Sequence, residues 1–126
     1  MNAGARGIAV WLVLPLAACS GDTMVAGQSK SMTAFAIAPY ENHEECMTMA
    51  AGERLDYQFQ AGASVTFDIR YLDGIAIVST ISREDVRESA GIFTSPLHRR
   101  YCAHWEAGHE GALVDFRLRL LPIRVR

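Results

Sequence analysis

Three stretches of the chain alternate apolar and polar residues with a period of two. They are "ERLDYQFQ" at 53–60, "SVTFDIRY" at 64–71 and "ALVDFRLRLL" at 112–121. Such alternation places one face of a β-strand on a hydrophobic core and the other face in water. A helix would scatter the same aromatic and aliphatic side chains around all of its sides. All three runs are therefore predicted to be strands.

Shorter apolar runs predict further strands, and turn signals such as Ala61-Gly62-Ala63, Asp73-Gly74 and Gly108–Gly111 separate them. Only "SREDVRES" at 82–89 looks helical, with Ser82 as the N-cap and one apolar residue, so one or two surface turns are expected there. The pattern as a whole predicts an all-β chain folded as a single antiparallel β-sandwich. The further strands are expected at "TAFAIA" (33–38), "CMTMA" (46–50), "IAIVST" (75–80), "GIFTS" (91–95) and "RRYCAHWE" (99–106).

The first residues carry a different pattern. Arg6 precedes the apolar run "IAVWLVLPLAA", which is long enough for the core of a signal peptide, whereas a bilayer-spanning helix needs about 20 residues. The run ends in Leu16-Ala17-Ala18-Cys19, which resembles the lipobox of bacterial lipoproteins. A cut after Ser20, with Ala18 and Ser20 as the small pair, is the competing interpretation.

The lipobox resemblance implies a cellular location. It implies cleavage before Cys19 and attachment of a diacylglycerol and a further acyl chain, such as palmitate, to Cys19. Two or more acyl chains hold a protein stably on a bilayer. Because Ser20 rather than Asp follows the cysteine, the family rule points to the outer membrane, facing the periplasm.

This organisation divides the chain into a signal peptide at 1–18, a flexible tether at 19–33 and a β-sandwich domain at 34–126. Removing 18 of the 126 residues leaves 108, enough for one domain. Loss of Arg6 moves the formal net charge from −2 to −3. This mild acidity, without a dense basic patch, argues against nucleic acid as a partner.

The chain has three cysteines. With Cys19 acylated, Cys46 and Cys102 remain, and an oxidising compartment favours a disulfide between them. His43, His104 and His109 lie close in sequence to these cysteines and are the candidate ligands of a soft-metal site. Disulfide formation would remove the thiolates, so neither a metal nor another cofactor is predicted.

The remaining polar clusters have ordinary explanations. The acidic residues Glu41, Glu44 and Glu45 are expected in a solvated loop. Trp105 is expected in the core, because it alternates with Tyr101 and Ala103. Arginines on the outer face of the last strand and on the tail are expected to protect an exposed edge against pairing; they are Arg117, Arg119, Arg124 and Arg126.

The order of elements resembles that of GOLD domains, β-sandwiches of Golgi-traffic proteins. The resemblance is carried by "EECMTMAAGERLDYQF", "VTFDIRYLDG", "AGIFTS" and "RRYCAHWE". In that family an early Glu-Cys pairs with a cysteine that follows a tyrosine, which matches Cys46 and Cys102 here. Arg99-Arg100 and Glu106 depart from the family's glycine and asparagine. The resemblance implies a domain that binds other proteins and catalyses nothing.

No nucleophile, zinc or phosphate-loop motif is found in the sequence, so an enzyme is not expected. The predicted function is that of a non-enzymatic, membrane-anchored lipoprotein whose β-sandwich binds a protein or another cell-envelope component. A lysozyme-inhibitor lipoprotein is an alternative, because "WEAGHEGA" at 105–112 is similar to the Trp-Gly-Ala element of that family. A periplasmic metal-binding module is the other.

Overall fold

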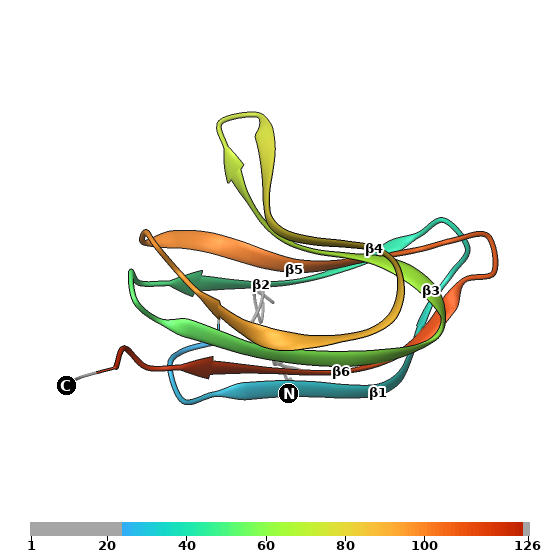
Figure 1. Ribbon diagram of the computed structural model, residues 1–126, viewed down its shortest axis with the longest axis horizontal. Coiled ribbons are helices and arrows are strands. Elements are labelled where there is room, and N and C mark those ends of the chain that lie inside the picture. Colours follow the sequence, from blue (N-terminus) through green and yellow to red (C-terminus); the bar gives the residue numbers. More distant parts are fainter. Residues whose placement is uncertain (1–23, 125–126) are drawn as a thin grey trace, which may run out of the picture.

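The computed structural model describes residues 24–124 of the chain, and all regular structure in this part is antiparallel β-strand (Figure 1). The strands pair in the order β1-β6-β3-β5-β2, and β4 pairs with β3. The predicted all-β class is confirmed. The strands are β1 (Ser29–Ile37), β2 (Asn42–Met49), β3 (Arg54–Asp73), β4 (Ala76–Thr94), β5 (Arg99–Ala107) and β6 (Ala112–Leu121).

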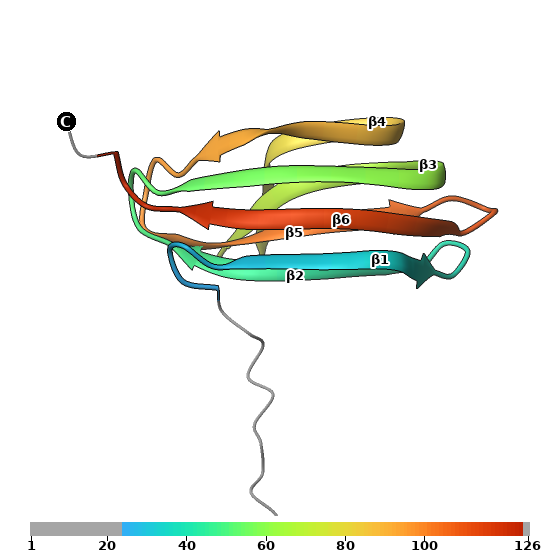
Figure 2. The same ribbon diagram turned by 90° about the horizontal axis from the view of Figure 1, so that it is seen from below.

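The β3–β4 hairpin is long and folds the sheet over on itself. The first half of β3 pairs with β6, and its second half, from Val65 to Arg70, pairs with β5. β4 follows β3 on both sides of the bend, where the register shifts between Gln60 and Val65. The result is two facing layers, β1-β6-β3-β4 and β2-β5-β3-β4; in Figure 2, β6 and β1 of the first layer lie in front of β5 and β2 of the second. The antiparallel sandwich is therefore made from one continuous sheet.

The alternating runs supply the core between the two layers. The alternating apolar positions from Leu55 to Ile69 of β3 and from Val114 to Leu120 of β6 point inward, and their large side chains are buried, as the sequence pattern predicts. Trp105 of β5 stacks on Phe116 of β6 with ring centroids 4.7 Å apart, so the aromatic side chains join the two layers. The prediction that Trp105 belongs to the core is confirmed, since only 1% of it is exposed.

Three sequence-based expectations about the strands and their borders are wrong in the described region. Residues 82–89 are not helical but lie within β4, because backbone pairing with β3 satisfies their polar groups. The tether does not extend to residue 33, because β1 begins at Ser29 and pairs there with Arg119. Arg117 and Arg119 do not protect an edge, because β6 lies between β1 and β3.

The predicted signal peptide, Cys19 and the start of the predicted tether lie outside the described residues. Met24 is the first described residue and is already packed in the core. Between Met24 and Arg124 there is no helix long and apolar enough to cross a membrane.

Candidate functional site

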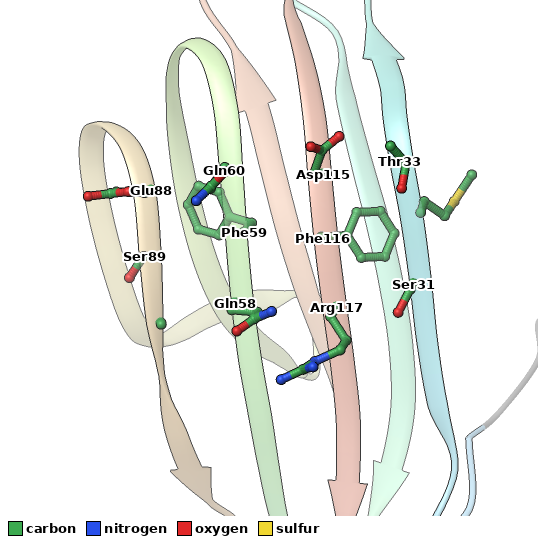
Figure 3. Close-up of a pocket in the computed structure, with 12 residues that line it drawn as sticks. Ser31, Thr33, Gln58, Phe59, Gln60, Glu88, Ser89, Asp115, Phe116 and Arg117 are labelled. Carbon is green, nitrogen blue, oxygen red and sulfur yellow. The ribbon is translucent and has the colours of Figure 1, made fainter.

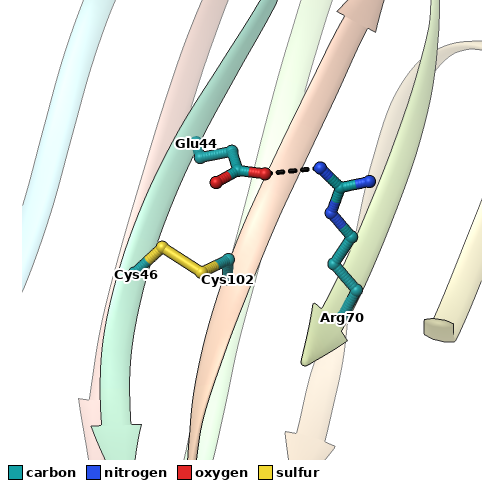
Figure 4. The surroundings of a disulfide bond; sticks show 4 residues. All are labelled: Glu44, Cys46, Arg70 and Cys102. Atoms are coloured by element: carbon teal, nitrogen blue, oxygen red, sulfur yellow. Dashed lines mark hydrogen bonds and ion pairs between the residues drawn. A yellow bond between two sulfur atoms is a disulfide. The ribbon is translucent and has the colours of Figure 1, made fainter. Parts of the chain in front are cut away.

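The two cysteines of the domain form a disulfide. Cys46 on β2 lies directly opposite Cys102 on β5, and the two sulfur atoms are bonded (Figure 4). Beside the bond, the Arg70 guanidinium donates a hydrogen bond to the Glu44 carboxylate. Glu44 and the two sulfurs lie within 4.8 Å of one another. Because the sulfurs are bonded to each other, they are not available as thiolate ligands.

The three candidate histidines do not converge. His43 and His104 lie on the adjacent strands β2 and β5, but they point to opposite faces of this layer: His43 is opposite Trp105 and contacts the core, whereas His104 is opposite Glu44 on the outer face. His109 is exposed in the turn between β5 and β6. Because successive residues of a strand face opposite sides, the pairing of Cys46 with Cys102 does not place the imidazoles of His43 and His104 at one site.

His104 is buried although it lies on the outer face. Only 4% of the residue is exposed, and its Nδ1 atom has no hydrogen-bond partner among residues 24–124. Burial, and secondarily the nearby Arg70 guanidinium, lowers the pKa of His104, while Glu44, Asp68 and Glu106 act in the opposite direction. Its imidazole is consequently held in the neutral form over a wider pH range than in water.

The side where β1 faces β2 is closed by a polar cluster. The Glu45 carboxylate accepts a hydrogen bond from Lys30 Nζ at 2.6 Å and lies 2.8 Å from His43 Nε2. Glu45 is buried, and the ring of His43 packs against Phe35. The expected solvated acidic loop is thus wrong for Glu45, because β2 begins at Asn42 and turns this side chain inward, where its charge is paired with Lys30.

A hollow of about 780 Å³ lies on the outer face of the β1-β6-β3-β4 layer (Figure 3). The four strands each contribute polar side chains to it, and the exposed members are hydroxyls, amides, carboxylates and one guanidinium. Portions of Met32, Phe59 and Phe116 also line it. The polar residues of the hollow are Ser31, Thr33, Gln58, Gln60, Glu88, Ser89, Asp115 and Arg117.

Strand register places these polar residues side by side. Arg117 is opposite Ser31 of β1 and opposite Gln58 of β3, so one row crosses three strands. Asp115 lies one pleat further and accepts a hydrogen bond from the backbone N–H of Ala34 at 2.6 Å. This bond fixes the β1 irregularity between Met32 and Phe35, where Ala34 has a φ of 52°.

Sequence reasoning singled out Arg117 but assigned it to edge protection, and it did not identify the other members of the hollow. Their only local signal is that they occupy the polar positions of alternating strands, a property shared by every solvent-facing strand residue. Trp105, which begins the lysozyme-inhibitor-like "WEAGHEGA" element, is buried in the core rather than presented at the surface.

No protein-family model matches the chain. No curated protein matches it either. Among solved structures, the chain is similar to the pre-peptidase C-terminal domain of a collagenase from Bacillus anthracis, with a TM-score of 0.47 and 10% sequence identity over 78% of this chain and 91% of that domain. A likeness of this size says nothing about what this chain binds.

Proposed function

We propose that the chain is a non-enzymatic lipoprotein, anchored through acyl chains on Cys19, whose hollow on the β1-β6-β3-β4 layer binds a glycan of the bacterial cell envelope. The domain sits on the periplasmic side of the outer membrane. The anchor follows from the lipobox resemblance, and the ligand class follows from the chemistry of the hollow.

The mixture of donors and acceptors in the hollow is the observation that carries the ligand class. Sugar hydroxyls both donate and accept hydrogen bonds. The amides of Gln58 and Gln60 do the same, whereas Arg117 only donates and an ionised Glu88 only accepts. The centre of a protein–protein interface is instead enriched in exposed aromatic residues. No aromatic side chain that lines the hollow is more than marginally exposed, since Phe59 and Phe116 belong to the core.

Pelleting with purified, insoluble peptidoglycan tests the proposed ligand class. The chain from Ser20 to Arg126 is suitable, because it contains the six strands and the buried core that the structure describes, which lie between Met24 and Leu121. Arg117→Ala removes a donor from the hollow, and Arg119→Ala is the matched control, since Arg119 points outward from the same strand but does not line the hollow. Circular dichroism and intact mass report the fold and the disulfide of each variant.

The expected result is that the wild-type chain pellets with peptidoglycan, that Arg117→Ala weakens this binding about tenfold or more, and that Arg119→Ala leaves it unchanged. Loss of a charge-assisted hydrogen bond is worth about 1.5–3 kcal/mol, which sets that fold-change. Equal binding by all three chains, or no binding of the wild type, would contradict the proposal.

The lipid anchor is tested separately. Intact-mass measurement of the full chain produced in a Gram-negative host should give a mature N-terminus at Cys19 that carries acyl chains. The Cys19→Ser variant should lose the acyl mass and move from the membrane fraction to the soluble fraction. An unmodified cysteine, or a cut after Ser20, would rule out the anchor.

A further inference from the structure

The tip of the β3–β4 hairpin exposes three large aliphatic side chains. The turn between the strands consists of Gly74 and Ile75, with Gly74 at a φ of +63°. Ile75 is fully exposed, and the cross-strand pair of Leu72 and Ile77 is 66% and 57% exposed. A turn of this kind needs glycine at a positive φ but no isoleucine beside it. Figure 1 shows the hairpin standing away from both layers.

Arginines surround the base of this hairpin. Leu72 and Ile77 share a hollow of about 380 Å³ with Arg99 and Arg100 of β5, and the disulfide forms part of its lining. The Arg99 guanidinium lies 4.5 Å from the centre of the Tyr71 ring. In a bilayer, the anionic headgroups lie at the surface and the acyl chains lie beneath them. A hairpin that enters tip first would therefore bring its aliphatic side chains to the acyl chains and the guanidinium groups behind them to the headgroups.

We propose that the hairpin tip inserts into the interface of a bilayer that contains anionic lipids, with Leu72, Ile75 and Ile77 among the acyl chains and the arginines at the phosphates. A bilayer accommodates a projecting apolar tip without a shaped pocket. Long arginine side chains bury their methylenes in the interface and keep the guanidinium at the headgroups. The tip would then be a second membrane contact, independent of acylation.

The choice of a membrane over another occupant rests on the proposed anchor. If Cys19 carries the acyl chains, only residues 20–23 separate it from Met24, which is packed in the core. Five extended residues span at most about 18 Å. The domain would therefore be held against the bilayer surface, where an exposed aliphatic tip would otherwise remain in contact with water.

Two carboxylates lie near the tip and limit the electrostatic attraction. Asp73 precedes the turn, and Glu44 is paired with Arg70. Arg99 and Arg100 outnumber the unpaired Asp73, so anionic lipid should strengthen binding only modestly. Each basic residue at an anionic surface contributes about a fivefold change in affinity.

Vesicle flotation with the chain from Ser20 to Arg126 tests the inference, because this chain lacks Cys19 and cannot be acylated. The probes are vesicles of phosphatidylcholine alone and of phosphatidylcholine mixed with phosphatidylglycerol. The variants are Ile75→Ser at the tip and Arg100→Ala behind it. Ile92→Ser is the control, since Ile92 is an exposed isoleucine of β4 that lies outside the hairpin tip and is as exposed as Ile77, at 57%.

Wild-type chain should float with the mixed vesicles and bind phosphatidylcholine alone about fivefold more weakly. Ile75→Ser should weaken binding to the mixed vesicles about tenfold, as expected for removing a buried aliphatic side chain, and Arg100→Ala about fivefold. Ile92→Ser should bind like the wild type. No flotation of the wild type, or equal binding by Ile75→Ser and Ile92→Ser, overturns the inference. Neither outcome bears on acylation or on peptidoglycan binding, which have their own measurements.

Discussion

Gly91 on β4 leaves just enough room for the buried ring of Tyr57 on the paired strand β3. The two residues are directly opposite in the register. A Cβ atom built at Gly91 would lie 2.7 Å from Tyr57 Oη and 3.0 Å from its Cζ. Tyr57 is 4% exposed and its ring packs against Phe67 at 5.3 Å, so the ring has little freedom to withdraw. The Gly91→Ala variant is therefore expected to be destabilised.

The magnitude is a difference between two effects. Forcing an extra methyl group into a packed site costs about 1–3 kcal/mol. Replacing a strand glycine by alanine returns about 0.5–1 kcal/mol of backbone entropy. The free energy of unfolding should consequently fall by about 1 kcal/mol, within a range of about 0–2.5 kcal/mol. Urea unfolding monitored by circular dichroism measures this change.

Gly62→Ala is the matched control within the same hairpin. A Cβ atom at Gly62 would meet only the carbonyl oxygen of Leu113, at 3.9 Å, so this variant should be neutral or stabilised by up to about 1 kcal/mol. Tyr57→Phe removes the closest atom and should reduce the cost of Gly91→Ala, with a coupling of about 0.5–1 kcal/mol. If Gly91→Ala is as stable as Gly62→Ala, the steric reasoning is refuted.

Two further predictions concern the disulfide and His104. The double variant Cys46→Ser/Cys102→Ser opens a loop between residues 56 positions apart and should lower the free energy of unfolding by about 4 kcal/mol. Urea unfolding of the variant and of the oxidised wild type measures this difference. A loss below about 1 kcal/mol would show that the bond does not restrain the unfolded chain. Because the pKa of His104 is lower in the folded chain than in the unfolded chain, the unfolded chain is protonated at this residue at a higher pH than the folded chain. The stability that the neutral imidazole confers should therefore be complete above pH 6.5 and decline as the pH falls below it. His104→Gln should flatten the pH dependence of unfolding in that window, and an unchanged slope would contradict the assignment.

The strands with strict alternation were predictable from sequence because their inward positions are filled by large apolar residues. Leu118 and Phe67 are examples whose burial follows from the pattern alone. The bend in β3 was not predictable in the same way. Ala61-Gly62-Ala63 has the composition of a turn, and local composition does not distinguish a reversal of direction from a bend within one strand. Only pairing with β6 before the bend and β5 after it reveals the difference.

The charged stretch in β4 illustrates the same limit. Between Ser82 and Ser89 only Val86 is apolar, and a helix N-cap signal is present. Tertiary pairing decides the outcome, since Val86 lies opposite Val65 and is half-buried while the charged residues remain exposed. A strand at the margin of a sheet also benefits from such charges, because they discourage pairing with other chains.

The two proposed binding surfaces are connected through the bend of β3. Its first half contributes Gln58 and Gln60 to the polar hollow of one layer, and its second half carries Leu72 in the apolar hairpin that continues the other layer. Because the strand folds between these segments, none of the described residues lines both surfaces. A glycan bound in the hollow therefore leaves the side chains of the hairpin tip available for a bilayer. A bilayer bound at the tip likewise leaves the polar groups of the hollow available for a glycan. Simultaneous binding follows as the expected behaviour: peptidoglycan should not compete with vesicles for the wild-type chain, and mutual exclusion would place the two ligands on one surface.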